Sequence, residues 1–382
     1  MSSKSRVPPP SSTAPASRIV LAYSGSLRTS VAIPWLKEKY GAEVVTATMD
    51  LGLGRELEAV RDRALASGAV RAHVLDLREE FARAFVVPAL KAGAAYDDSR
   101  AMAPRLGRPL IAQKLVELAR MEQARAVAHG GGPAELDLAV RTLDPTVTVI
   151  ATAVENAISQ AEEVAYLQTR GLAVPVAVDR PYRADANLWG RTLLWAGPDD
   201  PWTDLPESIF ALTRSPAACP DEPAYVDLSF ERGVPTAVNG VLMPIVDLIA
   251  SLGTIVGAHG VGRSDTAETR PGHVRVRTVT EAPAAVALHT AHQELGRLAA
   301  WPPGVHAERT ERFSRLVAQE YVDIICAGRW FTPLREALDA FVDKAQEQVT
   351  GVVRLKLFNG RCHIVGDGST APPRRMLAVT PA

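Results

Sequence analysis

The sequence predicts an α/β fold, with a doubly wound parallel sheet in the first part of the chain and an α+β domain after it. From Arg18 to about Ser159, short apolar runs of strand type alternate with helical segments, which is typical of a parallel sheet. Loops of small and hydroxyl residues follow two of these runs, and ligands bind beyond such strand ends. After Ser159 the alternation gives way to a stretch rich in Pro and Trp and to widely spaced strands.

Length and composition exclude several classes of protein. The 382 residues suffice for two domains, and 47% hydrophobic with 22% charged residues is typical of a soluble globular protein. A net charge of -1 gives no general attraction to nucleic acid or acidic lipid, and no apolar run reaches the length of a membrane span. The cysteines, Cys219, Cys326 and Cys362, fit neither a disulfide framework nor a zinc site, which indicates a reducing, cytoplasmic location.

The first strand–loop–helix unit carries the strongest functional signal. Ile19–Leu21 is predicted as a strand, Tyr23–Ser30 as a loop of small and hydroxyl residues, and Val31–Glu38 as a helix. Backbone N–H groups at such a helix start, with the helix dipole, make an anion cradle. The stretch has neither the GxxxxGK[ST] nor the GxGxxG spacing, so an ordinary strand–turn–helix connection is the alternative.

The next segments complete the predicted sheet. Strands are predicted at 43–48, 72–75, 126–128 and 146–151, and helices at 56–67, 81–91, 110–122 and 162–169. Pro88 is expected to bend or interrupt its helix. His129–Gly132 follows a strand, as Ser24–Ser30 does, so both stretches are expected to face one site.

The second domain is predicted from fewer signals. Strands are expected at 225–230, 274–279 and 352–358, and a helix at 338–347. Residues 1–17 are predicted as a disordered tail, 18–165 as the α/β domain with the candidate nucleotide cradle, 166–365 as the α+β domain, and 366–382 as a flexible, Pro-rich tail.

Six motifs, in register from about Arg18 to Val365, carry a family resemblance. They are LAYSG at 21–25, RPLIA at 108–112, AHG at 128–130, NLWGR at 187–191, HGVGR at 259–263 and WFTPLREALDAF at 330–341. With these motifs the chain resembles argininosuccinate synthase.

The resemblance implies an N-type ATP pyrophosphatase fold, of the adenine nucleotide alpha hydrolase-like kind, followed by the synthetase domain. It implies a homotetrameric ligase of arginine biosynthesis that acts on small amino-acid-like substrates. ATP with Mg²⁺ activates the ureido oxygen of citrulline, pyrophosphate leaves, and the amine of aspartate displaces AMP. Magnesium arrives with ATP, and no metal site of the protein's own is expected.

The family's phosphate loop SGGLDTS reads SGSLRTS here. The resemblance implies nucleotide contacts from Ala22, Tyr23, Ser24, Gly25, Ser26, Arg28, Thr29, Ser30, Met49 and Gly130. Ser26 replaces a Gly and Arg28 an Asp, so a guanidinium is available for direct phosphate contact. Met49 stands where the family has a smaller Ala. If the helix begins near Leu27, Pro34 lies inside it and removes one backbone hydrogen bond.

The substrate positions implied by the resemblance are more altered. They are Arg100, Pro104, Gly132, Arg183, Thr192, Glu268 and Thr280. Thr192 and Glu268 keep the family's chemistry, whereas Arg100, Pro104, Arg183 and Thr280 replace a Tyr, a Thr, a Ser and a Tyr. The family's HGxTGKGNDQVRFE stretch, which holds aspartate and citrulline, is shortened here by about five residues after Gly130.

These changes leave several functional hypotheses. A site built to hydrogen-bond one substrate loses discrimination when its partners vanish. The main hypothesis is therefore an AMP-forming carbon–nitrogen ligase with changed substrates, in which Arg28, Arg100 and Arg183 are new anion contacts. Each of these arginines alone fits a solvated surface residue equally well. The alternatives are a catalytically inactive oligomeric scaffold or binding protein, and a true argininosuccinate synthase. No catalytic residue is identified.

Overall fold

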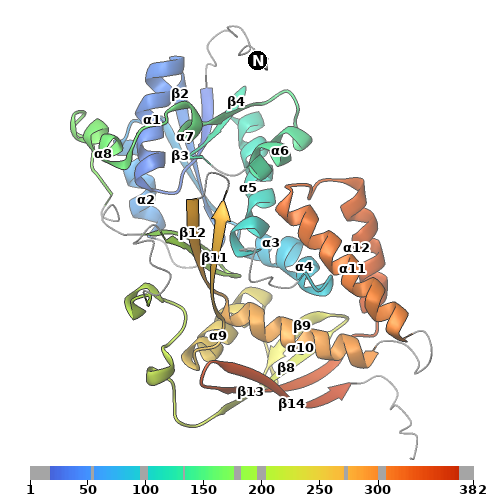
Figure 1. The fold of residues 1–382 in the computed structure, drawn as a ribbon. Coiled ribbons are helices and arrows are strands. Elements are labelled where there is room, and N and C mark those ends of the chain that lie inside the picture. Colours follow the sequence, from blue (N-terminus) through green and yellow to red (C-terminus); the bar gives the residue numbers. More distant parts are fainter. Residues whose placement is uncertain are drawn as a thin grey trace, which may run out of the picture. The chain divides into compact units, whose positions relative to one another are not determined.

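The computed structural model describes residues 18–52, 56–94, 102–131, 134–175, 182–195, 204–270, 274–299 and 307–369 (Figure 1). It divides into two compact units that are each discontinuous in sequence. The first comprises Met1–Met49, Arg55–Leu75 and Ile111–Val178, and the second Asp50–Gly54, Asp76–Leu110 and Asp179–Ala382. The predicted tail at 1–17 lies outside the described residues, and the predicted domain boundaries stay a prediction.

The first unit is built on a five-stranded sheet in the order β3-β2-β1-β4-β5. Its strands are β1 (Arg18–Ala22), β2 (Glu43–Asp50), β3 (Arg71–Asp76), β4 (Ala126–His129) and β5 (Thr148–Ala151). Strand β1 pairs in parallel with β2 and with β4, and β4 pairs in parallel with β5. The strand order reverses between β1 and β4, which is the position where such sheets open a crevice for ligands. The predicted α/β class with a parallel sheet is confirmed.

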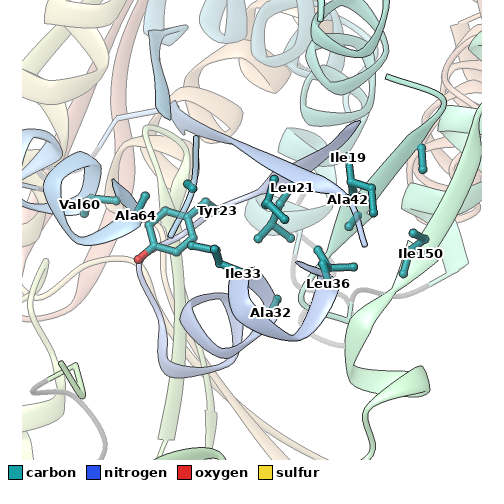
Figure 2. Packing of buried hydrophobic residues seen from close by; sticks show 14 residues of the cluster. Ile19, Leu21, Tyr23, Ala32, Ile33, Leu36, Ala42, Val60, Ala64 and Ile150 are labelled. Carbon is teal, nitrogen blue, oxygen red and sulfur yellow. The ribbon is translucent and has the colours of Figure 1, made fainter. Parts of the chain in front are cut away.

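The helices of this unit are α1 (Leu27–Tyr40), α2 (Leu57–Ala66), α6 (Ala134–Leu143), α7 (Thr152–Glu155), α8 (Gln160–Gln168) and the second half of α5 (Met102–Met121). Figure 2 shows the core in which α1 and α2 pack on β1, with Leu21, Ile33, Leu36 and Ala64 fully buried. Ile19, Val20 and Leu21 are all buried, as expected for a central parallel strand covered on both faces.

Helix α1 begins at Leu27, four residues before the predicted start at Val31, so Pro34 lies inside it. Ser26 is its N-cap, and the helix ends at Gly41, whose φ of 60° suits a residue without a Cβ.

The predicted helix at 81–91 belongs to a continuous segment of the second unit, α3 (Arg78–Phe81), a π-helical turn η1 (Ala82–Val86) and α4 (Val87–Lys91). The predicted interruption takes the form of this π-helical turn, in which Val87 N donates to Ala82 O. The ring of Pro88 would collide with a carbonyl of a regular α-helix, and the wider turn relieves this clash.

The second unit contains two antiparallel sheets. One has the order β10-β9-β8-β13-β14, and the other β11-β12-β7-β6. The strands are β6 (Tyr182–Asn187), β7 (Gly190–Trp195), β8 (Ala224–Glu231), β9 (Val234–Val238), β10 (Val241–Leu242), β11 (Arg263–Arg270), β12 (Val274–Glu281), β13 (Gly351–Phe358) and β14 (Arg361–Ser369). The helices are α9 (Ile245–Ala258), α10 (Pro283–Ala299), α11 (Ala307–Cys326), α12 (Pro333–Gln346) and the 3-10 turns η3 (Glu207–Ile209) and η4 (Pro216–Ala218).

Several boundaries differ from the sequence predictions. Helix α5 begins at Met102 and not at Leu110, because it continues through Pro109. Helix α12 begins at Pro333 and not at Leu338, since a Pro suits the first turn of a helix. Strand β14 extends to Ser369, so the start of the predicted Pro-rich tail forms a strand, and residues 370–382 lie outside the described residues. Helices α6, α9, α10 and α11 were not predicted.

Candidate functional site

The loop after β1 is anchored on both sides by backbone contacts. Tyr23 N donates to Ala47 O of β2 at 2.9 Å, and Thr48 Oγ1 donates to Tyr23 O at 3.1 Å. Gly25 has a φ of +73°, and a Cβ at this position would lie 3.3 Å from the methyl groups of Val60 on α2. The loop is therefore fixed in a conformation that favours glycine, at the end of β1.

A cluster of hydroxyl groups lines this loop. Ser24 Oγ donates to Ser26 Oγ at 3.0 Å, and Ser26 Oγ lies 3.1 Å from Thr29 Oγ1. Thr29 N donates to Ser26 Oγ at 3.5 Å and Ser30 N to Ser26 O at 2.9 Å, and the N–H groups of Leu27 and Arg28 precede the hydrogen-bond ladder of α1. Ser24 and Ser26 are exposed, so an anion can reach both the hydroxyls and the helix N-terminus. Small residues, a glycine that accepts close approach and free helix N–H groups fit the phosphates of a nucleotide.

Tyr23 and Ser30 do not present their side chains to this cradle. Tyr23 Oη lies 3.1 Å from Ser30 Oγ, and both residues are buried. Burial raises the pKa of the Tyr23 hydroxyl above its ordinary value. These two hydroxyls therefore hold the start of α1 to β1, and only the backbone of the two residues is available to a ligand.

The end of β4 lies against the same loop. A Cβ at Gly130 would lie 2.9 Å from Thr29 Cγ2, so only a glycine allows this approach. His129 is buried, and its Nε2 lies 2.7 Å from Asp137 Oδ1 of α6, a contact that holds the helix to the strand. The structure thus brings together the two stretches that the sequence placed at strand ends. The predicted residue Gly132 lies outside the described residues.

Arg28 forms an ion pair that the sequence did not predict. Its Nε donates to Glu163 Oε1 of α8 at 2.9 Å, and the Glu163 side chain is only 7% exposed. The two other predicted nucleotide positions, Ala22 and Met49, are partly exposed on β1 and β2, beside the loop and beside Asp50 respectively. Glu163 lies four residues before the buried Leu167 on α8, and this helical spacing was the available signal for its burial.

Four of the predicted substrate positions belong to the sheet β11-β12-β7-β6 of the second unit. Thr192 of β7 lies directly opposite Thr280 of β12, and both are buried. Residues opposite one another in an antiparallel pair share a face, so the two threonines are neighbours. Thr192 Oγ1 is buried and has no hydrogen-bond partner in the described part of the chain. A buried hydroxyl of this kind is available to a ligand.

The other two positions lie at opposite edges of this sheet. Arg183 is exposed on β6 and lies opposite Leu194, whereas Glu268 is on β11, opposite Val276. With two strands between them, β6 and β11 are roughly 14 Å apart, so the structure does not bring Arg183 and Glu268 together. The side chain of Glu268 is not among those that the structure describes.

The remaining predicted substrate positions are Arg100 and Pro104. Arg100 lies outside the described residues. Pro104 is buried in the first turn of α5, where a Pro is well tolerated, and it offers no polar side chain to a substrate. Next to it, Ala103 O accepts a hydrogen bond from Asn187 Nδ2, which fixes the turn between β6 and β7.

The sequence also gave no indication of the role of Glu281, the last residue of β12. Its carboxylate is fully buried and accepts hydrogen bonds from the backbone of Ala211, Leu212 and Thr213. Arg191 Nη1 lies 3.0 Å from its Oε2. Glu281 therefore fastens the 211–213 loop to the sheet that carries Thr192 and Thr280.

Within the described residues, no group of His, Cys, Asp and Glu side chains has the arrangement of a metal site. The helices in the same part of the chain are too short or too polar for a membrane span.

A hydroxyl-lined loop at the switch point of a parallel α/β sheet is typical of nucleotide-binding proteins, and this chain adds a unit with antiparallel sheets. Residues 18–173 match the arginosuccinate synthase N-terminal HUP domain, and residues 182–372 match the arginosuccinate synthase C-terminal domain. The chain belongs to the argininosuccinate synthase family of ATP-dependent ligases.

Relatives match nearly the whole chain. The argininosuccinate synthase of Carboxydothermus hydrogenoformans is 43% identical over 357 residues, which cover 92% of this chain and 88% of the relative. Those of Symbiobacterium thermophilum and Pelotomaculum thermopropionicum are 43% and 44% identical over 355 residues, 91% of this chain and 87% of each relative. The predicted family is confirmed.

Proposed function

We propose that this protein is an argininosuccinate synthase, which joins citrulline and aspartate with the conversion of ATP to AMP and pyrophosphate. The observation that carries the proposal is the hydroxyl-lined loop at the start of α1, held against Gly130. Relatives of 40–44% identity that bear this name support the choice of substrates. The altered substrate positions predicted changed substrates, whereas the relatives favour the alternative of a true argininosuccinate synthase.

In this reaction ATP supplies the adenylyl group that turns the ureido oxygen into a leaving group. The hydroxyls of Ser24 and Ser26 and the first N–H groups of α1 bind the phosphate oxygens. Thr29 completes the hydroxyl cluster, and the backbone of Ala22, Tyr23 and Gly25 sets the path of the loop. Magnesium bound to ATP would supply positive charge against the pyrophosphate that leaves, beside the hydroxyls of this loop.

The second unit supplies groups for the zwitterionic substrates. The unpartnered hydroxyl of Thr192, beside Thr280, donates to or accepts from the polar atoms of citrulline. Glu268, which keeps the family's carboxylate, binds a cationic group of the same substrate.

A changed amine substrate is the second candidate, and one observation favours it. Helix α6 begins at Ala134, only a few residues after β4 ends at His129, so the connection has no room for the family's aspartate-binding stretch. Asp137, at the start of α6, contacts His129. An amine other than aspartate would then attack the same adenylated intermediate.

We further propose a cytoplasmic homotetramer. Three free cysteines fit a reducing compartment. Exposed apolar residues on the C-terminal helices, among them Phe313, Leu316 and Phe341, provide surface for subunit contacts.

Pyrophosphate release tests the proposal. The purified protein is incubated with ATP, Mg²⁺ and citrulline, with aspartate or with each of a panel of other amino acids. We expect release with aspartate and formation of argininosuccinate, identified by mass. Release only with another amine would establish the second candidate. No release and no ATP binding would establish the inactive scaffold.

A further inference from the structure

We propose that Glu163 is a positioning residue of the phosphate loop, which holds the guanidinium of Arg28 so that its remaining N–H groups face the phosphates of a nucleoside triphosphate. The inference rests on the proposed function, since it concerns how the same loop binds ATP. Its structural basis is the ion pair between α1 and α8.

Arg28 is held at its backbone, at its aliphatic stem and at its Nε. Its backbone belongs to the first turn of α1, and its stem lies against the end of β4, where a Cβ at Gly130 would lie 3.7 Å from Arg28 Cγ. Its Nε donates to Glu163 Oε1 at 2.9 Å. The side chain is 28% exposed, so part of it still reaches solvent, and Arg28 lies two positions after Ser26 in the phosphate loop.

Glu163 lies on α8, a helix that is held in place by hydrogen bonds at its start and near its end. Helix α8 begins with a capping box between Ser159 and Glu162. At its other end, Tyr166 and Arg170 both donate to Glu38 of α1. Polar contacts at Glu163 and at Tyr166 and Arg170 thus fasten this segment to α1, and the contact at Glu163 reaches the phosphate loop.

The geometry of the guanidinium explains why the contact with Glu163 would affect phosphate binding. The guanidinium is planar, so a hydrogen bond from Nε fixes both the plane and the direction of the two Nη groups. These groups carry four further N–H donors, which suit phosphate oxygens in pairs. A buried carboxylate near phosphates is repulsive when unpaired, and the ion pair with Arg28 cancels that charge.

The test compares affinities for ATP and for adenosine, measured by calorimetry with Mg²⁺ present. The variants are Glu163→Gln and Arg28→Lys, the double variant, and Glu38→Gln as a matched control. Glu38→Gln removes the other carboxylate that joins α1 to α8, outside the loop. Arg28→Lys keeps Glu163 neutralised by a cation, so it preserves the fold if Glu163→Gln does not. Thermal unfolding checks that every variant is folded.

We expect Glu163→Gln and Arg28→Lys each to weaken ATP binding about tenfold, the size of one hydrogen bond to a charged group. Adenosine binding stays unchanged, the double variant is no weaker than Arg28→Lys, and Glu38→Gln binds ATP as the wild type does. If Glu163→Gln binds ATP as tightly as the wild type or more tightly, or if it loses as much affinity for adenosine as for ATP, the inference about Glu163 is wrong while the proposed function stands. A wild type that binds no ATP would overturn both the inference and the proposed function.

Discussion

Replacing Glu281 with Gln tests whether its buried carboxylate fastens the 211–213 loop. Both carboxylate oxygens are occupied, since Oε1 accepts from Leu212 N at 2.8 Å and Thr213 Oγ1 at 2.7 Å, and Oε2 from Ala211 N at 2.9 Å. In a glutamine, an N–H₂ group replaces one of these two oxygens, so in either orientation of the amide a donor faces donors. With the N–H₂ in place of Oε1, Leu212 N and both Thr213 donors lose their acceptor. With the N–H₂ in place of Oε2, it faces the guanidinium of Arg191, whose Nη1 lies 3.0 Å from that oxygen in the wild type.

The expected loss follows from these contacts. Each unsatisfied buried donor costs ~1–3 kcal/mol, and breaking a buried ion pair costs ~3–5 kcal/mol, so we expect Glu281→Gln to lower the free energy of unfolding by about 3–5 kcal/mol. Urea denaturation measures this quantity. Asp265→Asn is the control, because it removes an ion pair with Arg277 on the same sheet whose carboxylate is 38% exposed, and it should cost less than about 1 kcal/mol. Equal stability of the two variants would refute this account of Glu281.

Three further predictions concern the loop and the buried histidines. Arg28→Asp, which restores the family's residue, should lower the free energy of unfolding by about 3 kcal/mol, because it leaves Glu163 buried and unpaired. The double variant Arg28→Asp with Glu163→Gln should recover most of this loss of stability, measured by urea denaturation. Gly130→Ala should weaken ATP binding in calorimetry, since the new Cβ would lie 2.9 Å from Thr29 Cγ2 and displace that side chain from the loop. Gly296→Ala is the control, because no neighbouring atom lies within 4 Å of a Cβ at that position. Burial lowers the pKa of His289 to about 3, whereas the same side chain in the unfolded protein has its ordinary pKa of 6.5. Protons therefore bind the unfolded state first, and the contribution of His289 to stability falls as the pH drops from 6.5 toward 3. Thermal unfolding across this range should show a shallower pH dependence for His289→Leu, and an unchanged slope would contradict the prediction.

The nucleotide half was predictable because its signals are local. The apolar run of β1, the hydroxyl-rich loop and the helix after it are consecutive in sequence, and the switch point follows from strands that alternate with helices. Glu163 was not predictable as the partner of Arg28, because the two residues are 135 positions apart and only the packing of α8 on α1 joins them. The same holds for the loop that Glu281 fastens, since it lies 68 to 70 positions away.

Helix α5 shows why a local rule failed. The helix was predicted from Leu110, directly after Pro109, whose missing N–H group costs a helix interior one hydrogen bond. The helix nevertheless begins at Met102, with Leu106 and Leu110 buried on either side of the proline. Burial of the apolar face offsets the lost hydrogen bond, because tertiary packing supplies most of a helix's stability.

The interleaving of the two units in sequence has a consequence for synthesis on the ribosome. The segment 76–110 belongs to the second unit, yet it is made before the last segment of the first, Ile111–Val178. Its Phe85 stacks on Trp330, with ring centroids 4.9 Å apart, and about 245 residues separate the two. At ~5–20 residues per second, Phe85 waits roughly 12–50 s for this partner. The nascent chain therefore carries an apolar segment without its native cover while the first unit is already able to fold, and this is the interval in which a chaperone would act on it.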